Sequence, residues 1–275
     1  MSVDLRDEAT VPSDFVRSLR DLAAGPVIRT AGVAEWGPVA EWAATTDVGT
    51  KRADNEDAWG QRSGSFVVAD GMGGRPGGAT AATAAVAAAL DVFAGVVALH
   101  PLDWSARIAT VNDVVMTAGR RAGHDRVGAA IAIVRCVPGS VVISHAGDVR
   151  IYRLREGEVH LLTRDHNVGA EIHSAGRDPD TMVAARGKTA ALTSFVGGAT
   201  SWQRHSLRVL DARAGDQLVV CTDGVHRRLA RHDWLTTHQQ HPDCQSFVDA
   251  LVDRAAAVGS TDDRTALTIR IGPRS

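Results

Sequence analysis

The stretch that decides the fold is Phe66-Val67-Val68-Ala69-Asp70-Gly71-Met72-Gly73-Gly74. Its apolar run has the length and composition of a buried strand, and the strand ends in an Asp-Gly pair. A carboxylate at the end of a strand lies at the edge of a sheet, and glycine lets a ligand approach the backbone closely. The stretch therefore predicts a buried strand that presents Asp70 and the carbonyl of Gly71 at one sheet end.

Further apolar runs of strand length occupy residues 130–134, 141–144, 218–221 and 266–269. Turn signals at Pro138-Gly139 and Glu156-Gly157 divide residues 130–162 into consecutive strands, which predicts antiparallel hairpins. Apolar residues at helical spacing predict two long helices between residues 77 and 123 and a third near residues 247–255. This order favours an α+β fold in which sheets pack in layers with helices outside.

Composition limits the classes of function. The chain has 275 residues, 44% of them apolar, and a formal net charge of −2. This length can form one large core, and the small charge gives no field toward nucleic acid or a membrane. The three cysteines, Cys136, Cys221 and Cys244, have no Cys-x-x-Cys spacing, which argues against disulfides and thiolate zinc. Without a signal-peptide pattern, we expect a cytoplasmic protein.

Residues 1–40 contain no strand-like run, but Ser13 can cap a short helix, and Gly25-Pro26 and Gly37-Pro38 are typical of a linker. We therefore expect an N-terminal extension over residues 1–40 and one domain over residues 41–275. Residues 168–190 are poor in apolar side chains and rich in turn formers, which predicts a long excursion that acts as a flap.

Carboxylates recur beside other predicted strands. Asp223 follows the run at 218–221, Asp262 precedes the run at 266–269, and Glu56-Asp57 precede the run at residue 66. Mg²⁺ and Mn²⁺ prefer such oxygen ligands. The spacing predicts a metalloenzyme if these segments converge at one sheet end.

Taken in order, these segments resemble the motifs of the metal-dependent Ser/Thr protein phosphatases of the PPM group, also called type 2C. The resemblance covers about residues 45–271. The motifs stand as Arg52-Ala53-Asp54-Asn55-Glu56-Asp57, Asp70-Gly71-Met72-Gly73-Gly74, Gly147-Asp148-Val149-Arg150-Ile151-Tyr152, Leu162-Thr163-Arg164-Asp165-His166, Thr222-Asp223-Gly224 and Asp262-Asp263-Arg264-Thr265.

The resemblance implies a four-layer α-β-β-α sandwich of two antiparallel sheets flanked by helices. It also implies two tightly bound Mn²⁺ or Mg²⁺ ions that activate a hydroxide to attack phosphoserine or phosphothreonine. The metal ligands would be Asp70, the Gly71 carbonyl, Asp223 and Asp262, with Asp125 for a third, weaker ion. Glu56 and Asp57 would hold metal-bound waters, and Arg52 would bind the phosphate. The partners would be phosphorylated proteins and a cognate Ser/Thr kinase.

One departure lies inside a motif, because Asp263 stands where the family has Asn. The added charge is expected to change the metal site. The Asp148 motif more often supports the sheet in this family, so Asp148 is left outside the predicted catalytic set. The alternative function is a pseudophosphatase that only binds partners, and a metal titration would distinguish the two.

Overall fold

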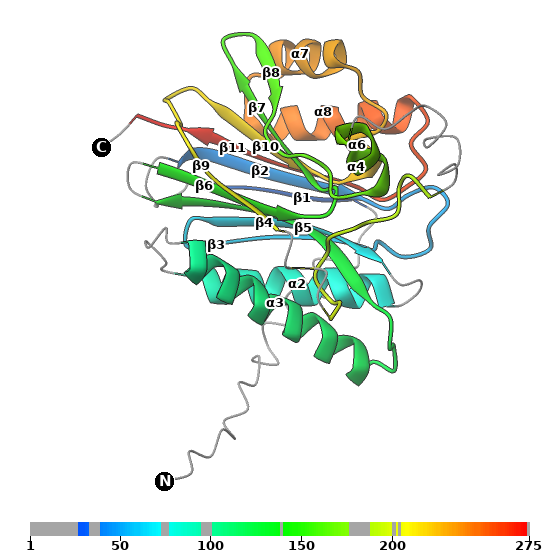
Figure 1. The fold of residues 1–275 in the computed structure, drawn as a ribbon. Helices are drawn as coiled ribbons and strands as arrows, with labels where there is room; N and C mark the ends of the chain where they lie inside the picture. Colours follow the sequence, from blue (N-terminus) through cyan, green and yellow to red (C-terminus); the bar gives the residue numbers. More distant parts are fainter. Residues whose placement is uncertain are drawn as a thin grey trace.

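Two antiparallel sheets pack face to face between two layers of helices in the computed structural model (Figure 1). It describes residues 27–32 (backbone only), 39–72, 77–94, 101–137, 140–175, 188–199, 202 and 205–273. The helix predicted from Ser13 and the turn at Pro138-Gly139 lie outside these residues. The predicted four-layer α+β sandwich is confirmed.

One sheet has six strands, in the order β1 (Val27–Gly32), β2 (Val39–Asp47), β11 (Arg264–Ile271), β10 (Gln217–Cys221), β7 (Arg150–Arg155) and β8 (Glu158–Leu161). The other has five, in the order β3 (Asp57–Arg62), β4 (Ser65–Met72), β5 (Gly128–Val137), β6 (Ser140–Ala146) and β9 (Ser206–Leu210).

Helices cover the outer face of each sheet. Helices α2 (Gly77–Phe93) and α3 (Pro101–Arg121) lie on the five-stranded sheet, and α7 (Arg231–Gln240) and α8 (Cys244–Ala257) lie on the six-stranded sheet (Figure 1). Two short helices, α4 (Val168–Ser174) and α6 (Asp223–His226), follow β8 and β10. None of the described helices is both long and apolar enough to cross a bilayer.

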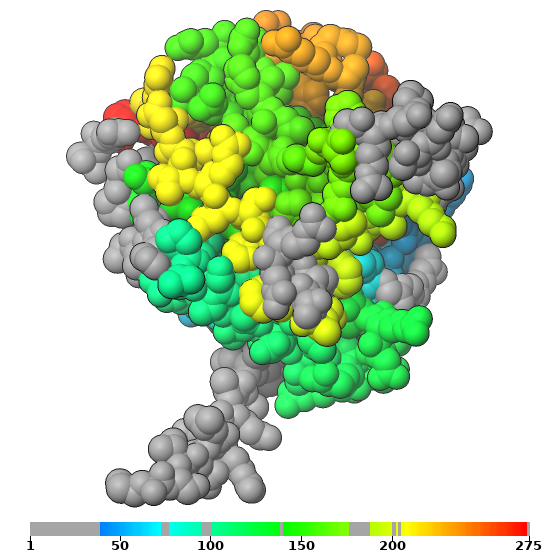
Figure 2. Space-filling model, in the orientation of Figure 1, coloured from blue at the N-terminus to red at the C-terminus, as the bar shows by residue number. Residues whose placement is uncertain are grey.

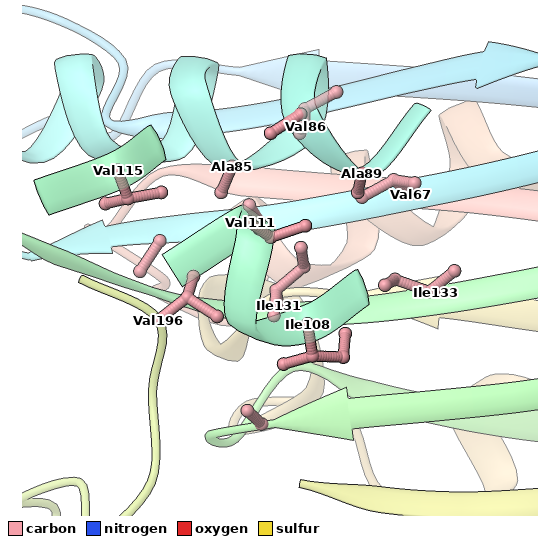
Figure 3. Close-up of a cluster of buried hydrophobic side chains, with 14 of the residues drawn as sticks. Val67, Ala85, Val86, Ala89, Ile108, Val111, Val115, Ile131, Ile133 and Val196 are labelled. Carbon is pink, nitrogen blue, oxygen red and sulfur yellow. The ribbon is translucent and has the colours of Figure 1, made fainter. Parts of the chain in front are cut away.

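Three apolar clusters hold the four layers together, one between the sheets and one under each helical layer. The cluster under α2 and α3 joins Val67, Ile131 and Ile133 of the sheet to alanines of α2 such as Ala85 and Ala89 (Figure 3). Alanine favours helix formation, and its small side chain lets α2 approach the sheet closely. The position of α2 matters for the site, because its first turn follows the Asp70 motif.

The strands between residues 130 and 162 form two hairpins, as expected, but the hairpins belong to different sheets. Strands β5 and β6 pair in one sheet, and β7 and β8 pair in the other. The chain crosses between sheets at Gly147, whose φ of +107° suits glycine. A Cβ at Gly147 would lie 2.4 Å from Cβ of Ala130. The sequence signals marked the turns within each hairpin but not this change of sheet.

The expectation that residues 1–40 lack a strand is wrong. Strand β1 pairs with β2 along its whole length, from Val27 opposite Asp47 to Gly32 opposite Trp42. The flanking glycines and Gly25-Pro26 suggested a linker because turn formers also border short edge strands. The domain boundary at residue 41 stays a prediction, although the six-stranded sheet takes one of its strands from residues 27–32.

The excursion expected over residues 168–190 begins with α4, whose first turn is capped by the Asn167 side chain accepting the Ala170 N–H at 2.9 Å. Residues 188–199 are irregular and touch the sheet through Val196, which bridges to Ala129 of β5. In Figure 2 residues 188–199 and β9, lime to yellow, lie across one face between α3 and the β7–β8 hairpin. A flap function for this segment stays a prediction.

The packing of α3 gives a test of the core. Trp104 is fully buried and its ring lies 4.4 Å from that of Phe93, whereas Leu102 on the same helix is 72% exposed. We expect Trp104→Ala to lower the free energy of unfolding by about 3–5 kcal/mol. Leu102→Ala, the matched control, should change it by less than about 0.5 kcal/mol. Urea unfolding followed by far-UV circular dichroism measures both, and equal losses would contradict the assigned packing.

Candidate active site

The predicted site residues meet where four strands begin or end. Asp57 opens β3 and lies opposite Asp70 near the end of β4. Asp223 follows β10, and Asp262 precedes β11 at the same end of the six-stranded sheet, because Cys221 pairs with Ala266. The register of both sheets therefore brings carboxylates from distant parts of the chain to one end of the sandwich.

Two threonine hydroxyls tie the sheets together at this end. Thr222, directly after β10, and Thr265 of β11 donate to Oδ2 of Asp57 in the five-stranded sheet at 2.8 and 2.7 Å. Since the Thr265 hydroxyl donates to Asp57, it accepts from Thr46, whose oxygen lies 2.7 Å away. Asn55 in turn donates to Thr46 at 2.8 Å. This chain of hydrogen bonds fixes the Asp57 side chain, and Oδ1 receives no hydrogen bond from the described residues.

Asp70 is the carboxylate that the described surroundings compensate least. Burial raises its pKa well above the ordinary range, and the charges of four other carboxylates, Asp57, Asp223, Asp148 and Asp262, raise it further. No hydrogen bond or ion pair from the described residues reaches the Asp70 side chain. Asp70 is partly buried, and an anion that is desolvated among other anions is unfavourable unless a cation is nearby.

Arg52 supplies positive charge to one side of this cluster. Its guanidinium donates from Nη1 to Oε2 of Glu56 at 2.7 Å and from Nε to Oδ1 of Asp262 at 2.8 Å. The Glu56 side chain is buried, while that of Arg52 is 37% exposed. Arg52 is thus partly exposed, and both of its partners are carboxylates of the predicted site.

Arg227 supplies positive charge to the other side. Its guanidinium lies 2.5 Å from Oδ2 of Asp223 and 2.9 Å from Oδ2 of Asp148. Burial raises the pKa of Asp223, and the positive charge of Arg227 acts to lower it. Burial, followed by the charge of Asp223, raises the pKa of Asp148 to about 6, against the opposing effect of Arg227. Asp148, set aside in the sequence prediction, therefore belongs to the same electrostatic cluster.

Gly71 lies where the start of α2 meets the end of β4. Its N–H donates to the carbonyl of Glu56 at 3.0 Å. A Cβ at Gly71 would lie 2.0 Å from the carbonyl oxygen of Gly78, and a Cβ at Gly78 would lie 2.7 Å from Oε1 of Glu56. Side chains at these glycines would displace both Glu56 and the backbone of Gly71.

Asp125 is not joined to the cluster. It is exposed in the turn between α3 and β5, and it makes no hydrogen bond or ion pair with any described residue. The turn itself lies near the start of α2, since a Cβ at Gly77 would lie 3.5 Å from Cγ of His124. A role for Asp125 in binding a third ion stays a prediction.

Comparison with known proteins decides the family. A family model described as protein phosphatase 2C matches residues 45–267, which include every motif of the site. The chain belongs to the protein phosphatase 2C family. It is therefore a protein phosphatase, and the resemblance found in the sequence is confirmed.

Relatives of this phosphatase occur in several bacteria. A Streptococcus pyogenes protein named as protein phosphatase 2C-type is 27% identical over 230 residues, which cover 80% of this chain and 93% of the relative. The Streptococcus agalactiae serine/threonine phosphatase, whose structure is known, is 25% identical in sequence. The two structures align with a TM-score of 0.74 over 88% of this chain and 99% of the other.

A further structure is that of the catalytic domain of the serine/threonine protein phosphatase PstP in complex with two manganese ions. It is 21% identical, with a TM-score of 0.71, and covers 90% of this chain and 99% of that one. At 21% identity, the similarity between the two structures shows that they share a fold.

The side chains of this phosphatase 2C domain fit hard divalent cations by their chemistry. All the clustered ligands are oxygen donors, and two guanidiniums already pair with them. Among the described residues, however, no group of three or more acidic, histidine or cysteine side chains stands in the geometry that holds an ion. In this structure the carboxylates pair with guanidiniums instead, Arg52 with Glu56 and Asp262, and Arg227 with Asp223.

Sequence reasoning missed several functional side chains of this phosphatase. Thr222 and Thr265 were within the quoted motifs, but nothing in their spacing showed that both hydroxyls reach Asp57 across the sheets. Arg227 had a usable signal, since it lies four residues after Asp223 and such pairs meet on a helix.

The charge on Asp70 gives a test of the cluster. Asp70→Asn removes a partly buried charge and its repulsion by neighbouring carboxylates, so the metal-free variant should melt a few degrees higher than the wild type, at about 2–4 °C per kcal/mol. Saturating Mn²⁺ should raise the melting temperature of the wild type but have little effect on the variant. Calorimetry with and without chelator measures both shifts.

Asp91→Asn is the matched control for this test. Asp91 pairs with Arg62 on the exposed side of α2, so the change should leave both the metal-free melting temperature and the Mn²⁺ shift close to wild type. A metal-free Asp70→Asn variant that melts below the wild type would show that Asp70 is a stabilising charge instead.

Proposed function

We propose that this phosphatase hydrolyses phosphoserine and phosphothreonine in protein substrates with two tightly bound Mn²⁺ or Mg²⁺ ions. The observation that carries the proposal is Asp70, a carboxylate crowded by four others and reached by no described donor. The proposed ligands are Asp70, the Gly71 carbonyl, Asp223 and Asp262. The two manganese ions of the PstP structure support the same number and kind of ion here.

Such a pair of ions supplies Lewis-acid charge and lowers the pKa of a water toward neutrality, so that attack on phosphorus needs no nucleophilic side chain. The protein's part is to place water and substrate. Asp57 is held by Thr222 and Thr265 through Oδ2 alone, which leaves Oδ1 to accept a hydrogen bond from water. Glu56 lies beside the start of α2, where a Cβ at Gly78 would lie 2.7 Å from its Oε1, and is proposed to hold a second water.

Arg52 is proposed to bind the phosphate. Its guanidinium is a planar fork that matches two phosphate oxygens, and its partial exposure makes it accessible to a substrate. In the structure it is shared between Glu56 and Asp262. When those carboxylates engage ions and water, the guanidinium is free to bind the transferred group and to stabilise charge in the transition state.

Removal of metal tests this function most simply. After dialysis against chelator, hydrolysis of an aryl phosphate and of phosphoserine peptides should vanish and should return with Mn²⁺ or Mg²⁺. Asp223→Asn and Asp262→Asn should each lower kcat by orders of magnitude, since each loses a proposed ligand. Asp91→Asn serves again as the control.

Full activity in excess chelator would contradict the two-ion proposal. Tight metal binding by calorimetry without any hydrolysis would favour the alternative, a pseudophosphatase that binds partners.

Arg52 gives a separate prediction. Arg52→Ala should lower kcat/KM for an aryl phosphate by about ten- to a hundredfold, the value of a charge-assisted pair. Inhibition by inorganic phosphate should weaken in parallel. Arg62→Ala, which breaks an exposed ion pair between β3 and Asp91 of α2, is the control and should change neither constant. Wild-type kinetics for Arg52→Ala would remove Arg52 from the phosphate site.

The substrate proteins, a cognate kinase, a third ion at Asp125 and a cytoplasmic location stay predictions from the sequence.

A further inference from the structure

The loop that carries Arg52 is fastened at both ends by one buried side chain, that of Asp263. Oδ1 of Asp263 accepts the backbone N–H of Gly49, and Oδ2 accepts the backbone N–H of Glu56, both at 2.8 Å. The side chain is 4% exposed. Its two oxygens thus face the backbone of residues 49–56.

This geometry requires a carboxylate. Both partners are N–H donors, and a carboxylate has an acceptor oxygen for each. An asparagine side chain has one oxygen and one NH₂ group, so one of the two backbone donors would face another donor and lose its bond. Asp263, in place of the family's Asn, therefore supplies one acceptor oxygen to each of the two N–H donors of this loop. The expectation that Asp263 mainly adds charge beside the ions overlooked these two bonds.

Close backbone packing aligns the same loop with Asp262. A Cβ at Gly49 would lie 2.4 Å from the carbonyl carbon of Asp262 and 2.5 Å from the carbonyl oxygen of Thr261. The N–H of Lys51 donates to that Thr261 oxygen at 3.3 Å, and the N–H of Arg52 donates to Gly49 at 2.8 Å. The loop that bears Arg52 and Glu56 is thereby held against the segment that bears a proposed metal ligand.

We propose that Asp263 is a positioning residue, which holds Arg52 and Glu56 at the distance from Asp262 that phosphate binding requires. The inference rests on the proposed function of Arg52. A group held in one geometry binds its ligand without first being ordered, so loosening the loop weakens phosphate binding. Asp263→Asn, which restores the residue typical of the family, impairs this chain.

The test compares Asp263→Asn with Asp216→Asn. Asp216 is also buried and accepts a backbone N–H, that of Arg213 at 2.8 Å, but it precedes β10 at the end opposite Asp223. Amide hydrogen exchange over residues 49–56 of the metal-free protein reports the loop independently of activity. With saturating Mn²⁺, KM for an aryl phosphate and the inhibition constant of inorganic phosphate report phosphate binding.

In Asp263→Asn the Gly49 and Glu56 amides should exchange faster. KM for the aryl phosphate and the inhibition constant of inorganic phosphate should both rise by about tenfold. The fall in kcat should be smaller than this rise. Asp216→Asn should leave the exchange of residues 49–56 and both constants unchanged. If Asp263 acts through Arg52, adding Asp263→Asn to Arg52→Ala should change the phosphate inhibition constant by less than about twofold. A merely structural role would not depend on Arg52 in this way.

The positioning role of Asp263 would be overturned if phosphate inhibited Asp263→Asn as strongly as the wild type while inhibiting Arg52→Ala more weakly. That result would leave the proposed function standing. Unchanged inhibition in Arg52→Ala would overturn the phosphate role of Arg52 and the positioning role with it. If Asp263→Asn does not fold, Asp263→Ser keeps one acceptor, and the same rise in both constants is expected. Its absence in that folded variant would overturn the inference.

Discussion

Repulsion among carboxylates at one end of the sandwich is the constraint on which the site depends. The register that puts Asp57 opposite Asp70, and the placement of Asp223 and Asp262 beside β10 and β11, concentrate negative charge there. Three apolar clusters fix the strands, so the charges cannot move apart without loss of core packing. The protein instead compensates them locally, with two threonine hydroxyls on Asp57 and guanidiniums on Asp262 and Asp223.

The compensation is uneven, and the unevenness indicates function. Arg52 pairs with Glu56 and Asp262, and Arg227 pairs with Asp223 and Asp148, whereas Asp70 has no such partner among the described residues. Under the proposed function, ions would compete with the two guanidiniums for the same oxygens of Asp262 and Asp223. Binding of ions and release of Arg52 toward a substrate would then be linked, and linkage of this kind is reciprocal.

The sequence predicted the layers and most of the core strands because buried runs such as Phe66–Ala69 carry a strong local signal. It predicted the convergence of Asp70, Asp223 and Asp262 through the order of the motifs. It did not predict β1, an edge strand whose glycine and proline neighbours suggested a linker, or the crossing between sheets at Gly147.

The sequence pattern could not predict side-chain contacts between residues far apart in the chain. The hydroxyl of Thr265 reaches Asp57 over a separation of 208 residues, and Asp263 reaches the Glu56 amide over 207. Such contacts depend on the packing of the two sheets, which no local propensity encodes. For Asp263, the sequence showed a departure from the motif but not its partners, so the chemical reason for the carboxylate appeared only with the backbone in place.

The most direct test is the anomalous scattering of a crystal grown with Mn²⁺, measured at the manganese absorption edge. The account predicts two peaks in contact with the Asp70 carboxylate, with Arg52 displaced from Asp262 and Arg227 from Asp223. A map without manganese at Asp70, in which both arginines keep their present ion pairs, would contradict the claim that this carboxylate cluster is a metal centre.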